Sequence, residues 1–298
     1  MSARRFKMKR LPGIIKVLTG LAVDFIIIYL LFSSLSAACI VTGLIAAYVW
    51  LGGYIALLKN GAVGLRKLPA HQADQLNMAR SQLISDIRTV SRIDLSDMKL
   101  FLVPGDEMNA TAYGAGGVSV TRGMLDNADP IMLTAVLGHE ASHLIHLDSE
   151  FNRLIFASVT LLTASLSILS AAAAAAIFLI FLIFNCFRSW LGVLCFKGTT
   201  SFTRGLFGFV QRCVVTIYRV VLGLASRHAE YRCDRFSAQL GYGVQLVHFL
   251  LMEDAAEAKA MTLADTIYRS HPPTPKRIAR LEQQLHSQRK DLAKRNVD

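Results

Sequence analysis

The feature that most constrains this chain is a set of apolar tracts too long for the core of a small globular domain. Residues 14–32 and 35–58 form two such tracts near the N-terminus. Each is about 20 residues long, enough for a helix to cross the hydrocarbon core of a bilayer. We therefore expect a tight transmembrane hairpin. Asp24, a costly group in lipid, should face a neighbouring helix within it.

Two further tracts follow in the second half of the chain. Residues 154–187 are too long for one perpendicular span, since at about 1.5 Å per residue a helix would reach roughly 50 Å. Residues 205–225 are a weaker candidate, because Arg212 and Arg219 lie within them. This segment is either a span with a polar face or an amphipathic helix at the interface, and we favour the span for a topological reason given below.

The composition agrees with a chain divided between membrane and water. Hydrophobic residues make up 53% of the chain and charged residues 18%, although the segments between the tracts are ordinarily charged. Part of the net charge of +11 lies in the opening MSARRFKMKR, and basic flanks of this kind favour the cytoplasmic side. No zinc-finger, helix-turn-helix or RNA-binding signature accompanies the charge, so we expect no nucleic-acid partner. The N-terminal tract lacks an evident cleavage site and is read as a retained anchor.

Residues 61–153 have the pattern of a folded domain in water. A polar, periodic helix is expected over residues 71–90, and strands over MKLFLVP and GGVSVT. In the segment NADPIMLTAVLGHEASHLIHL, Asp129 suits the N-cap and Pro130 the first turn of a helix. That helix carries the HEASH motif.

The HEASH motif has the spacing of a metal site. His139 and His143 are four residues apart, so both imidazoles lie on one helix face and can reach one zinc ion. Glu140 lies beside that face, where it can accept a proton from water. Two surface histidines would give the same pattern by chance. A metzincin site is excluded, because positions 146 and 149 hold His146 and Ser149.

The downstream segment SRHAEYRCDRFSAQLGY offers a third ligand. Glu230 and Asp234 are four residues apart, as a carboxylate ligand and a supporting carboxylate require. The alternative is a solvated helix face on which the two acids are answered by neighbouring arginines. With the HEASH motif upstream, Glu230 is the favoured third ligand.

This ligand set restricts the topology. Glu230 must come within about 2 Å of the ion held by the two histidines. The intervening chain must then cross the bilayer an even number of times or not at all, which is why we interpret the two later tracts as a pair of spans. The expected division is residues 1–60 as a transmembrane hairpin, 61–153 and 227–298 as the two parts of a catalytic domain, and 154–226 as a second transmembrane pair.

Four ordered motifs carry a resemblance to a known family. They are HEASH at 139–143, EYRCD at 230–234, NATAYG at 109–114 leading into GGVSVTRGML, and HPPTPKRI at 271–278. With them the chain resembles the HtpX family of membrane-embedded zinc metalloproteases, related to the CAAX prenyl endopeptidases. The resemblance implies an α+β, mostly helical integral membrane protein with four transmembrane helices. It also implies a gluzincin-type zinc metalloprotease domain with a small sheet.

The resemblance also assigns roles to residues. It implies one Zn²⁺ per chain, held by His139, His143 and Glu230, with Glu140 as catalyst and Asp234 behind the ligands. His271 and Arg277 would lie near the site or brace it, although His271 is equally well read as a loop residue fixed by adjacent prolines. A substrate peptide would add as a further strand along a segment that comprises Asn109, Ala110, Gly117, Val118, Ser119 and Val120.

The leading hypothesis is a membrane-anchored zinc-dependent endopeptidase that hydrolyses unfolded or membrane-associated polypeptides in protein quality control and the stress response. We expect a multi-pass protein of the inner (plasma) membrane whose active site faces the cytoplasm. The basic segment 187–204 departs from the positive-inside pattern that this topology predicts. The rival hypothesis is a non-catalytic membrane scaffold that binds peptides by strand addition. The sequence names neither the substrate nor the oligomeric state.

Overall fold

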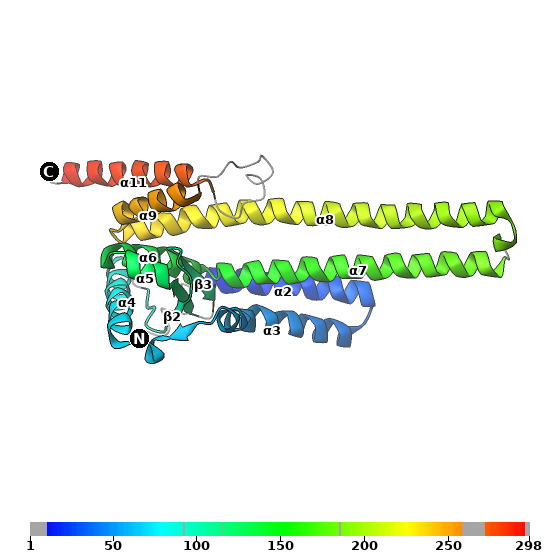
Figure 1. Cartoon of the computed structure of the whole chain (residues 1–298), viewed down its shortest axis with the longest axis horizontal. Coiled ribbons are helices and arrows are strands. Elements are labelled where there is room, and N and C mark those ends of the chain that lie inside the picture. The colour runs from blue at the N-terminus through cyan, green and yellow to red at the C-terminus, as the bar shows by residue number, and fades with distance from the viewer. Residues whose placement is uncertain (1–10, 92, 115, 185, 258–271, 296–298) are drawn as a thin grey trace. The chain divides into compact units, whose positions relative to one another are not determined.

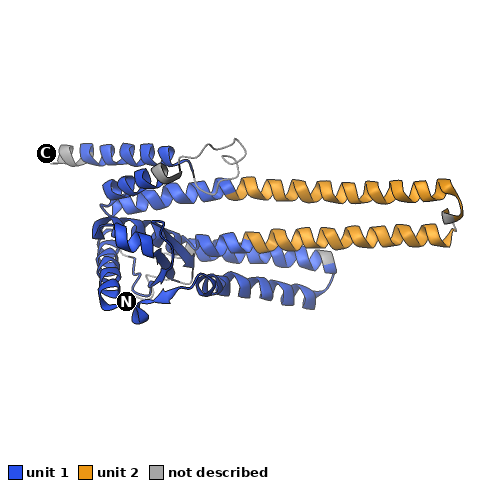
Figure 2. Cartoon of the chain, viewed as in Figure 1, with its two compact units in different colours: residues 1–154, 223–298 blue, residues 155–222 orange. Residues whose placement is uncertain are grey.

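The computed structural model describes residues 11–91, 93–114, 116–184, 186–257 and 272–295. The architecture is α+β and mostly helical with one small sheet, which confirms the predicted fold class (Figure 1). The chain forms two compact units, residues 1–154 with 223–298 and residues 155–222 (Figure 2).

The first unit begins with the expected helical hairpin, α2 (Leu11–Phe32) and α3 (Leu35–Lys59). Ser33 has a positive φ of 50° and Ser34 caps α3 by accepting a hydrogen bond from the backbone N–H of Ala37, so the two helices reverse within two residues. Many apolar side chains of both helices remain exposed, as lipid-facing side chains must be. Asp24 is buried within the protein, as the cost of a charge in lipid requires.

The sheet has the order β1-β2-β4-β3, which makes β4 an inner strand and β3 an edge strand. β4 pairs in parallel with β2 on one side and antiparallel with β3 on the other. Gly114 and Gly116, with φ values of +82° and +76°, allow the tight reversal between β3 and β4. The strands are β1 (Val63–Gly64), β2 (Lys99–Val103), β3 (Ala110–Gly114) and β4 (Gly117–Thr121).

Helix α6 (Pro130–His146) lies at the centre of the core. It packs against α4 (Ala70–Ser91), α9 (Gly243–Glu257) and strands β3 and β4, and nearly all its residues are buried. The short helix α5 (Arg122–Asn127) follows β4, and α11 (Thr274–Arg295) packs against α9. A helix buried all round is rigid and holds its side chains in fixed positions.

Both ends of α6 follow from the sequence. The carboxylate of Asp129 accepts hydrogen bonds from the backbone N–H groups of Ile131 and Met132, and Pro130 occupies the first turn. The helix ends where Leu147 adopts the left-handed conformation with φ 53°. Asp148 then begins the next helix in a new direction.

That next helix, α7 (Asp148–Ile183), and α8 (Trp190–Gln239) supply the later pair of apolar helices, joined through η2 (Cys186–Arg188). By length and composition, four described helices could cross a membrane, and α7 and α8 are two of them. Within the second unit the side-chain amide of Gln211 donates to the carbonyl of Thr163, so the two helices pair there. Residues 205–225 form the middle of one continuous helix.

Helix α3 of the membrane hairpin contacts the edge strand β3 at a glycine. A Cβ built at Gly53 of α3 would lie 2.1 Å from the carbonyl oxygen of Tyr113 in β3. The side-chain amide of Asn60, at the end of α3, donates to the Tyr113 hydroxyl at 2.6 Å. The position of the edge strand therefore depends on the absence of a side chain at residue 53.

We predict that Gly53→Ala lowers the free energy of unfolding by about 1–3 kcal/mol, because the new methyl group must displace the strand backbone. Thermal unfolding of the detergent-solubilised protein measures this. Gly43→Ala, in the same helix with no atom within 4 Å of its Cβ, is the matched control and should be neutral or stabilising. Equal effects of the two changes would contradict the prediction.

Candidate metal centre

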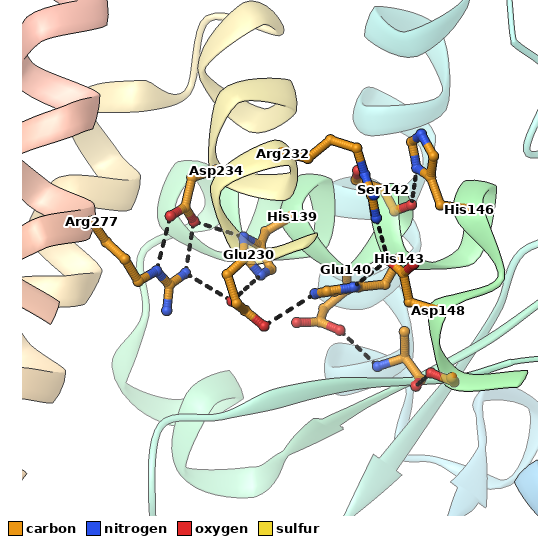
Figure 3. A network of polar contacts seen from close by, with 12 residues as sticks. His139, Glu140, Ser142, His143, His146, Asp148, Glu230, Arg232, Asp234 and Arg277 are labelled. Atoms are coloured by element: carbon orange, nitrogen blue, oxygen red, sulfur yellow. Dashed lines mark hydrogen bonds and ion pairs between the residues drawn. The ribbon is translucent and has the colours of Figure 1, made fainter. Parts of the chain in front are cut away.

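Four helices of the first unit bring charged and metal-ligating side chains to one buried place (Figure 3). α6 provides the two histidines and the glutamate of HEASH, while α8 and α11 approach from the other side. The residues that meet there are His139, Glu140, His143, Asp148, Glu230, Arg232, Asp234 and Arg277.

The two imidazoles face one carboxylate. His139 Nε2 lies 3.2 Å from Glu230 Oε2, and His143 Nε2 lies 3.5 Å from Glu230 Oε1. His139 and Glu230 are 6% and 3% exposed, so water does little to screen the group. Two imidazole nitrogens and one carboxylate form a donor set that zinc favours. The three predicted ligands are thus brought together.

The other ring nitrogen of each imidazole, Nδ1, lies next to a further carboxylate. His139 Nδ1 lies 2.9 Å from Asp234 Oδ1, and His143 Nδ1 lies 2.9 Å from Asp148 Oδ2. A carboxylate at Nδ1 places the proton there and turns the Nε2 lone pair toward a cation. Asp234 occupies the place predicted for it. The role of Asp148 was missed, and its position next to the helix end gave no periodic signal.

Arg277, from α11, braces the carboxylates of α8. Its Nε donates to Asp234 Oδ2 at 2.9 Å and its terminal nitrogen to Asp234 Oδ1 at 2.7 Å. The same nitrogen lies 3.4 Å from Glu230 Oε2. A bidentate pair of this kind fixes the orientation of a carboxylate. His271, predicted to lie nearby, falls outside the described residues.

Glu140 does not join the ligands. Its Oε2 accepts a hydrogen bond of 2.7 Å from the backbone N–H of Ala112 in β3, while the Ser149 hydroxyl donates to the Ala112 carbonyl at 2.5 Å. Both outward-facing backbone groups of Ala112 are therefore engaged by α6 and α7. The contact holds the glutamate carboxylate between the edge strand and the metal position.

The carboxylates make positive charge favourable in this buried place. Burial lowers the pKa of His139, but Asp234 and Glu230 outweigh it and raise the pKa to about 10. Burial likewise opposes protonation of His143, but Cys233 and Asp148 with Glu230 raise its pKa well above the ordinary value. A divalent cation would take the place of these protons.

Cys233 is a further group with ligand chemistry. Its sulfur and one nitrogen of each of His139 and His143 lie within 4.8 Å of one another, and the residue is fully buried. The signal that could have found it is its place three residues after Glu230, on the same helix face.

A cleft of about 900 Å³ opens over the site. One wall is the edge strand from Asn109 to Ala112, and the cleft extends to Lys16 of α2 and Phe151 of α7. His146 takes no part, since its Nδ1 lies 2.8 Å from the Ser142 carbonyl oxygen, to which it donates.

The residues of the predicted substrate-binding segment lie in two different places. Asn109 and Ala110 line the cleft. Residues 117–120 belong to β4, which is paired on both sides and therefore offers no open edge to a further strand. The outer strand on this side of the sheet is β3, for which the sequence pattern predicts no strand. The predicted residues that lie in β4 are Gly117, Val118, Ser119 and Val120.

A family model agrees with this arrangement. The model for peptidase family M48 matches residues 74–285, which is most of the chain and includes both histidines, both glutamates and Arg277. The chain belongs to peptidase family M48. It is therefore a metallopeptidase, and the four helices of its described residues that are long and apolar enough to cross a membrane make it a multi-pass membrane protein.

Curated relatives narrow the resemblance within M48. A protease HtpX homolog from Acidiphilium cryptum is 24% identical over 263 residues, 79% of this chain and 84% of that protein. One from Salinibacter ruber is 25% identical over 244 residues, 72% and 79% of the two chains. One from Aquifex aeolicus is 33% identical over 103 residues, but the match spans only 31% of that protein. The HtpX-like resemblance is confirmed.

A solved structure shares the fold of this M48 peptidase. The crystal structure of S. mikatae Ste24p matches with a TM-score of 0.51 and 19% identity, covering 92% of this chain and 66% of that one. This chain thus spans about two thirds of the Ste24p chain. At this identity the likeness concerns the fold alone.

The raised histidine pKa values predict that metal binding competes with protons. At pH 7 the imidazole of His139, with a pKa of about 10, carries a proton that a cation must displace. Zinc affinity should therefore rise as the pH rises toward that value, with about one to two protons released per ion. Calorimetry in buffers of different ionisation enthalpy measures the release. Affinity independent of pH between 6 and 9 would contradict the prediction.

A second prediction separates Glu230 from Cys233 as the third ligand. Glu230→Ala should weaken zinc binding by more than roughly 100-fold, since it removes a ligand as well as the group that faces both imidazoles. Cys233→Ala should change it by less than about fivefold. Chelator competition gives the affinities. Loss of binding in the cysteine variant alone would instead identify the sulfur as the ligand.

Proposed function

We propose that this M48 peptidase is a zinc-dependent endopeptidase acting on unfolded or membrane-associated polypeptides. The observation that supports this best is the pair of imidazole Nε2 atoms facing the Glu230 carboxylate, with Glu140 fixed beside them in an open cleft. One Zn²⁺ per chain would be held by His139, His143 and Glu230. A zinc ion in such a site supplies Lewis acidity and lowers the pKa of water.

Glu140 is the proposed proton carrier. Its Oε2 is anchored by the Ala112 N–H, so we assign proton transfer to Oε1. In the reaction Glu140 takes a proton from the attacking water and delivers it to the leaving amine. A carboxylate fixed in this way needs no reorganisation between the two transfers.

The substrate would bind along the β3 edge at Ala110, since the outward-facing backbone groups of Ala112 are already bonded to Glu140 and Ser149. Backbone groups two residues apart point the same way in a strand, so Ala110 faces the cleft as Ala112 does. An extended peptide that pairs with Ala110 would pass Glu140 and the metal position as it continues. Main-chain hydrogen bonds carry such binding and accept many sequences, which suits a quality-control protease.

The proposed placement is the inner (plasma) membrane with the active site facing the cytoplasm. The basic N-terminal segment and the basic residues after α3 support this orientation. Residues 1–60 and 154–226 then act as two membrane pairs, and residues 61–153 with 227–298 form the catalytic domain.

The decisive experiment is hydrolysis of unfolded casein by the purified full-length protein with zinc. Glu140→Gln should reduce the rate by roughly 100-fold to 10,000-fold while zinc binding is retained, because only the proton carrier is lost. Glu282→Gln, on the exposed surface of α11, is the matched control and should leave the rate unchanged. Equal rates for wild type and Glu140→Gln would defeat the proposal, and a wild-type protein that binds casein without cleaving it would favour a peptide-binding scaffold.

A further inference from the structure

Lys16 is a charged residue inside the first apolar tract, where a charge is costly. In the structure its side chain lines the active-site cleft. Nζ lies 3.1 Å from Asp148 Oδ1 and 4.5 Å from the centroid of the Phe151 ring. The lysine therefore belongs to the wall of the cleft.

The packing of α2 keeps Lys16 in this place. A Cβ built at Gly13 would lie 2.7 Å from the His146 carbonyl oxygen, and one at Gly20 would lie 2.5 Å from Leu154. Residues 13, 16 and 20 share one face of the helix. Small residues before and after Lys16 thus bring α2 into direct contact with the end of α6 and the start of α7.

The carboxylate that Lys16 contacts also has a second cation as a partner. Arg232 also lines the cleft and also binds Asp148, so two cations share one carboxylate. That carboxylate serves His143 as well. Side-chain exposures of 33% for Lys16 and 31% for Arg232 leave both cations accessible to a ligand.

We propose that Lys16 and Arg232 form an anion subsite that binds a carboxylate of the polypeptide substrate. The proposal rests on the proposed endopeptidase function and adds a preference to it. An ammonium group has three donors, of which Asp148 Oδ1 takes one. A substrate carboxylate that approaches from the cleft would accept charge-assisted hydrogen bonds from Lys16 and Arg232.

The structure also limits where that carboxylate lies. Lys16 contacts Asp148, which contacts His143, so one carboxylate and one imidazole separate Nζ from the metal position. That is within roughly 12 Å, or about three residues of an extended peptide at about 3.3 Å per residue. Either an acidic side chain or a C-terminal carboxylate near the scissile bond meets this limit.

The test uses quenched fluorescent peptides in which one glutamate is moved through the three positions on each side of the scissile bond, each paired with its glutamine counterpart. Wild type should cleave the glutamate peptide roughly tenfold faster in kcat/KM at one position, and the preference should decline with salt. A second series with free and amidated C-termini, its scissile bond near the end, tells the two carboxylate sources apart.

The variants decide the assignment. Lys16→Met should abolish the preference for the glutamate peptide over its glutamine counterpart. A loss that the variant causes through Asp148 and His143 would fall equally on both peptides and cancel in that ratio. Lys16→Glu should favour a lysine at the same position. Lys59→Met, at the exposed end of α3, is the matched control and should keep the preference.

Two results would overturn the subsite. One is the absence of any carboxylate preference in a wild-type enzyme that cleaves the glutamine peptides. The other is an equal loss on glutamate and glutamine peptides in Lys16→Met, which would show that Lys16 acts through Asp148 and His143 alone. Failure of wild type to cleave any peptide would defeat the endopeptidase function itself, and with it the subsite.

Discussion

The whole site depends on the meeting of Glu230 with the two imidazoles of α6. The chain between them leaves the core at Asp148, the first residue of α7, and returns along α8. The last turns of α8 must therefore lie next to α6. Bringing buried carboxylates together is unfavourable unless cations pair with them. Arg277 pairs with Asp234 and so neutralises part of the negative charge. The raised pKa values of His139 and His143 show that the remaining negative charge favours a bound cation.

The membrane hairpin is more than an anchor in this arrangement. Through Gly53, α3 lies against the edge strand that forms one wall of the cleft, and through Lys16, α2 reaches the carboxylate behind His143. Both contacts require small or charged residues within apolar helices, where composition alone would favour large hydrophobic ones. The departures from pure hydropathy in this hairpin therefore mark the places where it supports the site.

Much of the metal site and of helix α6 was predictable from the sequence, because the patterns that indicate them are local. Residues four apart on a helix predicted the histidine pair and the acidic pair, and the capping residues Asp129 and Pro130 predicted the start of α6. Strand order was not predictable, since the pairing of β3 with β4 joins short segments whose partners are set by the whole fold. Asp148 was missed for a related reason: its place behind His143 depends on the left-handed turn at Leu147, which no pattern announces.

The edge strand connects substrate binding to the chemistry. Because the Ala112 N–H holds Glu140, the strand proposed to receive the peptide also fixes the carboxylate proposed to carry the proton. A peptide in register with Ala110 would then be in register with Glu140 as well, without any separate device to align them. The proposed position of the scissile bond and the position of Glu140 would thus depend on one backbone, which α3, α6 and α7 hold in place.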